Sequence, residues 1–74
     1  MKIVVRSDMA ATVLRIEAAP GAEVGEDDAL VVLEAMKMEL PVLAGAAGRV
    51  AAIHVEEGQV VEEDQPLVTL EAQR

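Results

Sequence analysis

The chain has 74 residues and a net charge of −8, and it contains no Cys, Phe, Tyr or Trp. The charge argues against nucleic acid or an anionic membrane surface as a partner, and the missing aromatic residues remove the platforms on which single-stranded nucleic acid stacks. The missing cysteines exclude disulfides, thiolate metal sites and a cysteine nucleophile.

The first residues carry too short an apolar run for a signal peptide, because Arg6 interrupts it. No stretch approaches the ~20 apolar residues that a membrane helix requires. We therefore expect a cytoplasmic protein with no membrane partner.

Short apolar and β-branched runs separated by turn residues predict about eight strands. In chain order they cover residues 2–6, 13–18, a short stretch around 24, 29–35, 38–43, 50–55, 60–61 and 67–71. After the second strand, Pro20 and Gly21 predict a type II turn, since Pro fixes φ and Gly accepts a positive φ. Two sheets forming a flattened barrel or sandwich would bury these runs.

Helix is the competing interpretation of residues 29–39, because Ala, Leu, Met, Glu and Lys are strong helix formers. However, residues 30–33 have no polar face, and residues 67–70 alternate as a strand does. Pro41 also limits how far a helix could continue. We therefore predict an all-β fold.

The sequence contains an internal repeat. Residues 11–37 align with residues 48–74 without a gap, and eleven of the 27 pairs are identical. Two copies are too few for an open solenoid, so we expect them to pack around a pseudo-twofold axis as one domain over residues 1–74. The opening Met1 and the fit of the repeat to the chain end favour a complete small protein.

Lys37 lies at the reversal between the strands 29–35 and 38–43, and its repeat mate is Arg74. We expect Lys37 to stand at a hairpin tip, far from the chain ends. Exposed turns usually take Gly, Asn, Asp or Ser, yet Lys37 lies between Met36 and Met38. Large apolar residues at a tip suggest a surface that another protein recognises. The alternatives are an ordinary turn lysine and methionines that fill the core.

This hairpin resembles the attachment motif of biotinyl domains, the carrier modules of biotin-dependent carboxylases. The motif residues are Glu34, Ala35, Met36, Lys37, Met38 and Glu39. The resemblance covers nearly the whole chain, with residues 20–24 and 27–33 upstream, residues 45–50 and 58–67 downstream, and Gly48 at the usual glycine. It implies a barrel-sandwich hybrid of two four-stranded antiparallel sheets. The gapless repeat leaves no room for the "thumb" of some members, so the chain resembles the thumbless, free-standing biotin/lipoyl attachment proteins.

By this resemblance, a biotin–protein ligase would join biotin to the side-chain amine of Lys37. Glu34, Ala35, Met36, Met38 and Glu39 would be recognised by the ligase and by partner active sites. A biotin carboxylase would carboxylate the biotin, and a carboxyltransferase would pass the carboxyl group to an acceptor such as an acyl-CoA. The domain itself would be a non-catalytic carrier, monomeric in isolation.

Two other functions stay open. A lipoyl carrier of a 2-oxoacid dehydrogenase or of glycine cleavage shares the fold and the lysine position. Lipoyl domains usually carry an acidic residue and a small or hydroxyl residue beside the lysine, so Met36 and Met38 favour biotin, although free-standing attachment proteins can accept either group. The third possibility is an interaction module that is never modified.

The remaining polar residues give no sign of a second site. His54 is the repeat mate of Glu17, so we expect it to face solvent on a strand. The acidic clusters 26–28 and 62–64 lack the spacing and the glycine of a calcium loop and are interpreted as solvated turns. Ser7 has no base partner for a hydrolytic triad, and no glycine-rich phosphate loop occurs. We predict no metal site and no catalytic residue.

Overall fold

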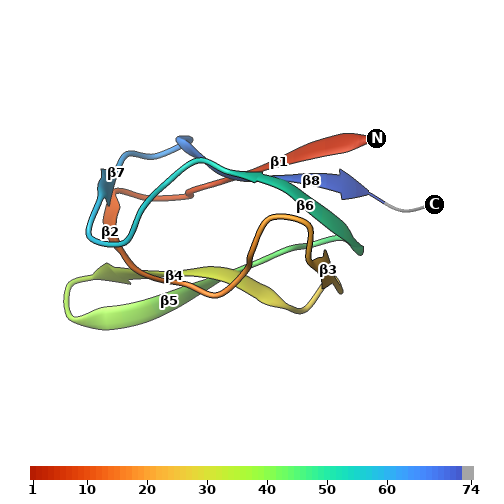
Figure 1. Ribbon diagram of the computed structural model, residues 1–74. Coiled ribbons are helices and arrows are strands. Elements are labelled where there is room, and N and C mark those ends of the chain that lie inside the picture. Colours follow the sequence, from red (N-terminus) through yellow and green to blue (C-terminus); the bar gives the residue numbers. More distant parts are fainter. Residues whose placement is uncertain (73–74) are drawn as a thin grey trace.

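The computed structural model describes residues 1–72, which form eight strands in two four-stranded antiparallel sheets (Figure 1). One sheet has the order β1 (Lys2–Arg6), β8 (Pro66–Ala72), β6 (Gly48–Ile53) and β3 (Glu23–Val24). The other has the order β5 (Met38–Leu43), β4 (Ala29–Ala35), β2 (Ala11–Ile16) and β7 (Val60–Val61). The predicted all-β class and the two four-stranded sheets are confirmed. The sheets are separate and do not join into a closed barrel.

The core lies between the two sheets and contains only aliphatic side chains. Its largest members are Leu30 and Leu33 on β4 and Leu67 and Leu70 on β8, all fully buried, with valines and alanines around them. Each buried leucine contributes about 1.5–3 kcal/mol relative to an exposed one. The run that could have been a helix is therefore a central strand, and its apolar residues are buried on both faces.

The predicted turn around Gly21 is present. Gly21 has φ 87°, and the Ala22 N–H donates to the Ala19 carbonyl over 3.0 Å, which closes the turn. Gly58 has nearly the same backbone, with φ 88°. Both positions need a residue that accepts a positive φ, and glycine does so without strain.

Two predicted strands were displaced by two residues. The strand expected at 13–18 is β2, which ends at Ile16, and the strand expected at 50–55 is β6, which ends at Ile53. Beyond β2, the N–H groups of Glu17 and Ala18 both donate to the single carbonyl of Leu30. The regular ladder stops there, although the sequence stays apolar as far as Ala18.

The molecule is elongated, measuring 37 × 17 × 17 Å, with the β4–β5 hairpin at one end and the N-terminus at the other (Figure 1). This places Lys37 far from the N-terminus, as predicted. Its proposed repeat mate, Arg74, lies outside the described residues. Residues 1–72 include no helix long and apolar enough to span a membrane.

Candidate functional site

The candidate site is the tip of the β4–β5 hairpin. The last pair of the ladder is Ala35 opposite Met38, which leaves Met36 and Lys37 as a two-residue loop. Both loop residues have a positive φ, 53° and 65°. This is the pattern of a type I′ turn, which matches the twist of the strands and usually contains Asn-Gly. Left-handed backbone costs an ordinary L-residue about 1–2 kcal/mol, so the tip holds strain at two consecutive residues.

The side chains at the tip point into solvent. Met36 is 94% exposed and Met38 is 59% exposed, so the alternative that they fill the core is wrong. Lys37 is also exposed, and among the described residues its ammonium group forms no ion pair and no hydrogen bond. The tip therefore presents an amine without a partner between two exposed apolar side chains.

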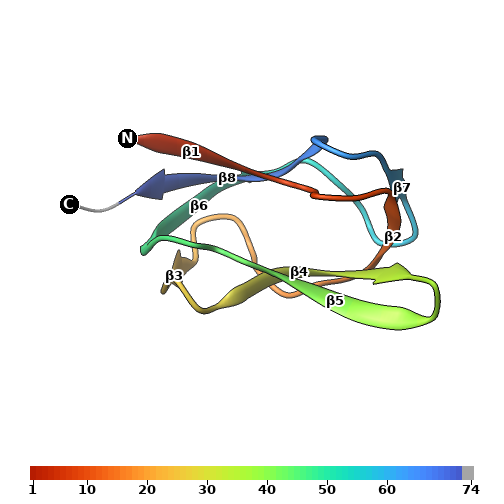
Figure 2. The same ribbon diagram turned by 180° about the vertical axis from the view of Figure 1, so that it is seen from behind.

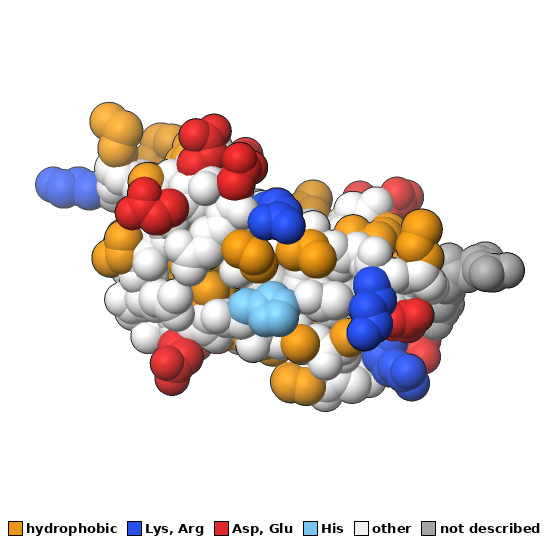
Figure 3. Space-filling view, turned by 90° about the horizontal axis from the view of Figure 1, so that it is seen from above, with side chains coloured by type: hydrophobic (Ala, Val, Ile, Leu, Met, Phe, Trp, Pro, Cys, Tyr) orange, Lys and Arg blue, Asp and Glu red, His pale blue; other side chains and the backbone are white. Residues whose placement is uncertain are grey.

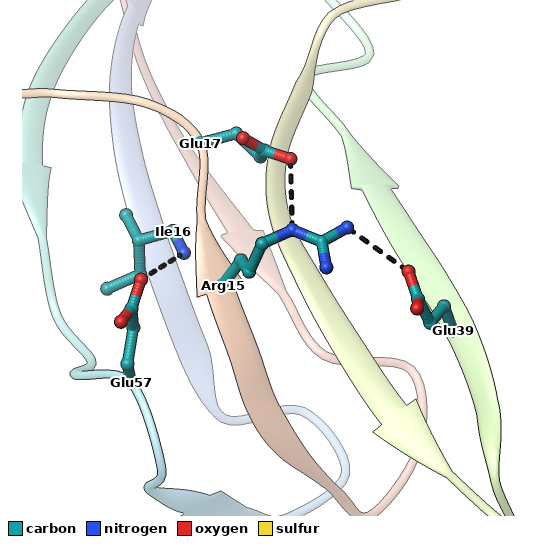
Figure 4. A network of polar contacts seen from close by, with 5 residues as sticks. All are labelled: Arg15, Ile16, Glu17, Glu39 and Glu57. Atoms are coloured by element: carbon teal, nitrogen blue, oxygen red, sulfur yellow. Dashed lines mark hydrogen bonds and ion pairs between the residues drawn. The ribbon is translucent and has the colours of Figure 1, made fainter.

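A salt-bridge network braces the outer side of the hairpin (Figure 4). Glu34 and Glu39 lie directly opposite one another on β4 and β5, an unfavourable pairing of like charges. Arg15 of β2 reaches across, with its Nη2 3.1 Å from Glu39 Oε1 and its Nε 3.5 Å from Glu17 Oε1. Hydrogen bonds to Glu39 and then to Glu17 raise the pKa of Arg15 above its usual value. Exposed pairs of this kind stabilise little, so their main effect is to orient Glu39.

Sequence reasoning missed Arg15 and the neighbouring contact, in which the Ile16 N–H donates to the Glu57 carboxylate over 3.2 Å (Figure 4). The sequence does indicate a nearby cation, because the predicted hairpin places two glutamates close together. Choosing Arg15 required the order of strands in the sheet, which places β2 beside β4.

The motif residues are thus gathered at one place. Ala35 is half-buried against the core, whereas the other residues of the motif are exposed. Ala35 therefore fixes the base of the hairpin, and its exposed neighbours form the surface that another protein can reach.

The other polar candidates lie away from the tip. His54, pale blue in Figure 3, is exposed as predicted, but it lies just beyond β6, which ends at Ile53, and not on a strand. Its Nε2 lies 2.7 Å from Thr69 Oγ1. In the first acidic turn, the Asp28 carboxylate accepts the Gly25 N–H over 2.8 Å. In the second, Asp64 takes a positive φ of 69°. Asp28 and Asp64 therefore belong to the two turns, as predicted for the acidic clusters.

Replacing Met36 by Asn is expected to raise the free energy of unfolding by about 1 kcal/mol, because Asn tolerates the left-handed region better than Met. The nearly full exposure of Met36 means that little packing is lost. Urea denaturation measures the change. Met38→Asn is the control, because Met38 lies in β5 outside the loop with positive φ and should show no such gain. Equal gains in both variants would contradict the type I′ strain.

The family described as biotin-requiring enzymes, the biotin/lipoyl family, matches residues 3–70. A biotinylated protein TB7.3 homolog of Mycobacterium leprae is 49% identical over 69% of this chain and 72% of its own length. The biotin carboxyl carrier protein of Streptococcus mutans is 49% identical over 64% of this chain, which spans only 36% of that protein.

Solved structures share the fold. A domain of a single-chain, multi-domain long-chain acyl-CoA carboxylase superimposes with TM-score 0.92 and 36% identity over 97% of this chain. This chain spans only 7% of that carboxylase. The lipoyl domain of the Azotobacter vinelandii 2-oxoglutarate dehydrogenase complex has TM-score 0.73 and 34% identity, covering 86% of this chain and 82% of that domain.

The group that this family and these relatives imply is biotin, bound covalently through a lysine. The structure fits it, because the hairpin tip offers a primary amine that no described residue engages and that open space surrounds. The chain therefore belongs to the biotin/lipoyl family and is a domain of the biotin carboxyl carrier type.

Proposed function

We propose that Lys37 is the residue to which a biotin–protein ligase attaches biotin. The observation that supports this most strongly is the exposed, strained two-residue turn that holds Lys37 between Met36 and Met38. The chain has one other lysine, Lys2, which lies on β1 near the N-terminus and not in a turn. Lys37 alone combines the family motif with a protruding position.

Attachment requires the neutral amine of Lys37. A base of the ligase takes a proton from Nζ, whose lone pair then attacks the carbonyl carbon of an activated biotinyl group. An amide bond forms, the nitrogen releases a second proton, and the activating group leaves with the electron pair of the bond that breaks. A tight turn at the end of an elongated molecule lets the ligase enclose Lys37 without contacting the sheets.

The domain then serves as a non-catalytic, monomeric carrier in the cytoplasm. Biotin supplies the chemistry when bound, accepting a carboxyl group at a biotin carboxylase and releasing it at a carboxyltransferase. Lys37 keeps the group on a flexible stem, which raises its effective concentration at each partner site. The likeness to an acyl-CoA carboxylase favours an acyl-CoA acceptor.

Lipoyl attachment is the second candidate, supported by the likeness to the lipoyl domain of the 2-oxoglutarate dehydrogenase complex. The two methionines beside Lys37 are the feature that favours biotin. A domain that accepts both groups would show both on the same lysine.

The intact mass of the protein from its native cell, with a tryptic map, tests the proposal. Trypsin does not cut after an acylated lysine, so biotin on Lys37 leaves residues 16–49 as one peptide that carries the biotin mass. A lipoyl increment on this peptide would move the protein to the second candidate. Cleavage after Lys37 in all molecules, in a cell with active ligases, would contradict attachment and favour an unmodified interaction module.

A further inference from the structure

A cleft lies between the edge strands β1 and β5. Figure 2 shows these two strands, with β1 in the upper sheet and β5 in the lower. Its volume of about 350 Å³ falls at the small end of the ~300–1,000 Å³ that is typical of ligand sites. The lining is mostly apolar and includes Val5, Met9, Leu40 and Leu43, with Arg6 and Asp8 as its polar members.

The cleft lies between two edge strands, each of which is paired with another strand on one side only. Among the strands of residues 1–72, β1 pairs only with β8, and β5 pairs only with β4. Two of the apolar side chains on its walls remain open to water, since Met9 is 40% exposed and Leu43 is 46% exposed. Covering such side chains with an apolar group is favourable.

A row of apolar side chains leads from the hairpin tip to this cleft. Residues two apart on a strand share a face, so Met38, Leu40 and Val42 line one face of β5. Met38 is largely exposed next to the tip, and the other two are half-buried and line the cleft. The row therefore connects the turn that carries Lys37 to the cleft.

The cleft is within reach of a group tethered to Lys37. Leu40 follows Lys37 by three residues, a separation of about 10 Å along a strand. The lysine stem and the acid chain of biotin place roughly ten bonds between the Lys37 Cα and the biotin ring, which extend to ~12 Å. The tether can therefore fold back along β5 and bring the ring to Leu40.

We propose that the cleft is a docking site for the biotin attached to Lys37, an inference that rests on the proposed function. The acid chain lies along the row of β5, and the bicyclic ring covers Leu40 and Met9, which line the same cleft. The ureido group of the ring has two N–H donors and one carbonyl acceptor. The Asp8 carboxylate accepts from such donors, and the Arg6 guanidinium has donors beyond the one that contacts the Asp64 carbonyl at 2.9 Å. The docked ring is then withheld from partner sites until it leaves the cleft.

The test uses protein that a ligase has loaded with biotin, with ¹³C-labelled methionine and leucine methyl groups. Intact mass first establishes that Lys37 carries biotin. We expect nuclear Overhauser cross-peaks between the ring protons and the methyl groups of Met9 and Leu40. The variant Met9→Gln should lose the cross-peaks to Leu40. The control Val60→Thr changes a 67% exposed apolar residue on β7, away from the cleft, and should keep them.

The association rate of avidin with the attached biotin gives a second readout. If the ring is docked half of the time, the Met9→Gln variant should bind avidin about twofold faster than the parent. Loaded protein without cross-peaks and with equal rates would overturn the docking site and leave the attachment at Lys37 intact. A mass without biotin after ligase treatment would overturn the attachment and the docking site together.

Discussion

Replacing Lys37 by Arg is expected to abolish biotin attachment while the domain stays folded. A guanidinium stays protonated at any pH a ligase works at, so it has no lone pair with which to attack an activated acyl group. Arg keeps the charge and occupies the same exposed turn, and surface changes of this kind usually alter stability by less than ~0.5 kcal/mol. Incubation with a biotin–protein ligase, followed by intact mass and by urea denaturation, measures both effects.

Lys2→Arg is the matched control, because Lys2 is the other lysine of the chain. This variant should take up one biotin as the parent does. Retained attachment in Lys37→Arg together with loss in Lys2→Arg would reassign the site to β1. An unfolded Lys37→Arg variant would show that the turn depends on Lys37 in a way that its exposure does not explain.

The sequence was enough to predict the strands, because their apolar runs differ from helical ones. Residues 30–33 are four consecutive apolar residues, and in the structure all four are buried in β4. A surface helix would have exposed some of them, so the missing polar face correctly favoured a central strand. The end of β2 was not predictable in the same way, because it depends on a backbone carbonyl of β4 that accepts two N–H groups.

The position of the candidate site in the chain was predictable, but the backbone conformation and the contacts at the site were not. The family motif placed Lys37 at a reversal, and the strand pairing agrees. The left-handed backbone of Met36 and Lys37 could not be predicted from these residue types, since type I′ turns usually contain Asn or Gly. The contact of Arg15 with Glu39 joins residues from β2 and β5, which are not neighbours in the sheet, and so it depended on the fold as a whole.

Gly48→Ala is expected to destabilise the domain by about 1–3 kcal/mol or more, because β6 and β8 leave no room for a side chain at this position. A Cβ added at Gly48 would lie 2.5 Å from the Glu71 carbonyl oxygen and 3.1 Å from the Ala72 Cα. Both are backbone atoms, so a rotamer change cannot relieve the contact. Domains of this size have a total stability of only about 4–11 kcal/mol. The midpoint of urea denaturation measures the loss.

Gly25→Ala is the control for this prediction, since the nearest atom to its added Cβ is Asp28 Oδ2 at an ordinary 3.8 Å. That variant should stay within ~0.5 kcal/mol of the parent. An unchanged midpoint in Gly48→Ala would mean that β6 and β8 approach each other less closely than described. Gly48 is the first residue of β6 and pairs with Val24 of β3 and with Ala72 of β8. Figure 1 shows β3 at the end of the molecule opposite the β4–β5 hairpin. Without urea, the folded fraction of this variant should therefore still accept biotin at the parent rate. That result would show that the substitution lowers the stability of the domain without affecting attachment at the tip.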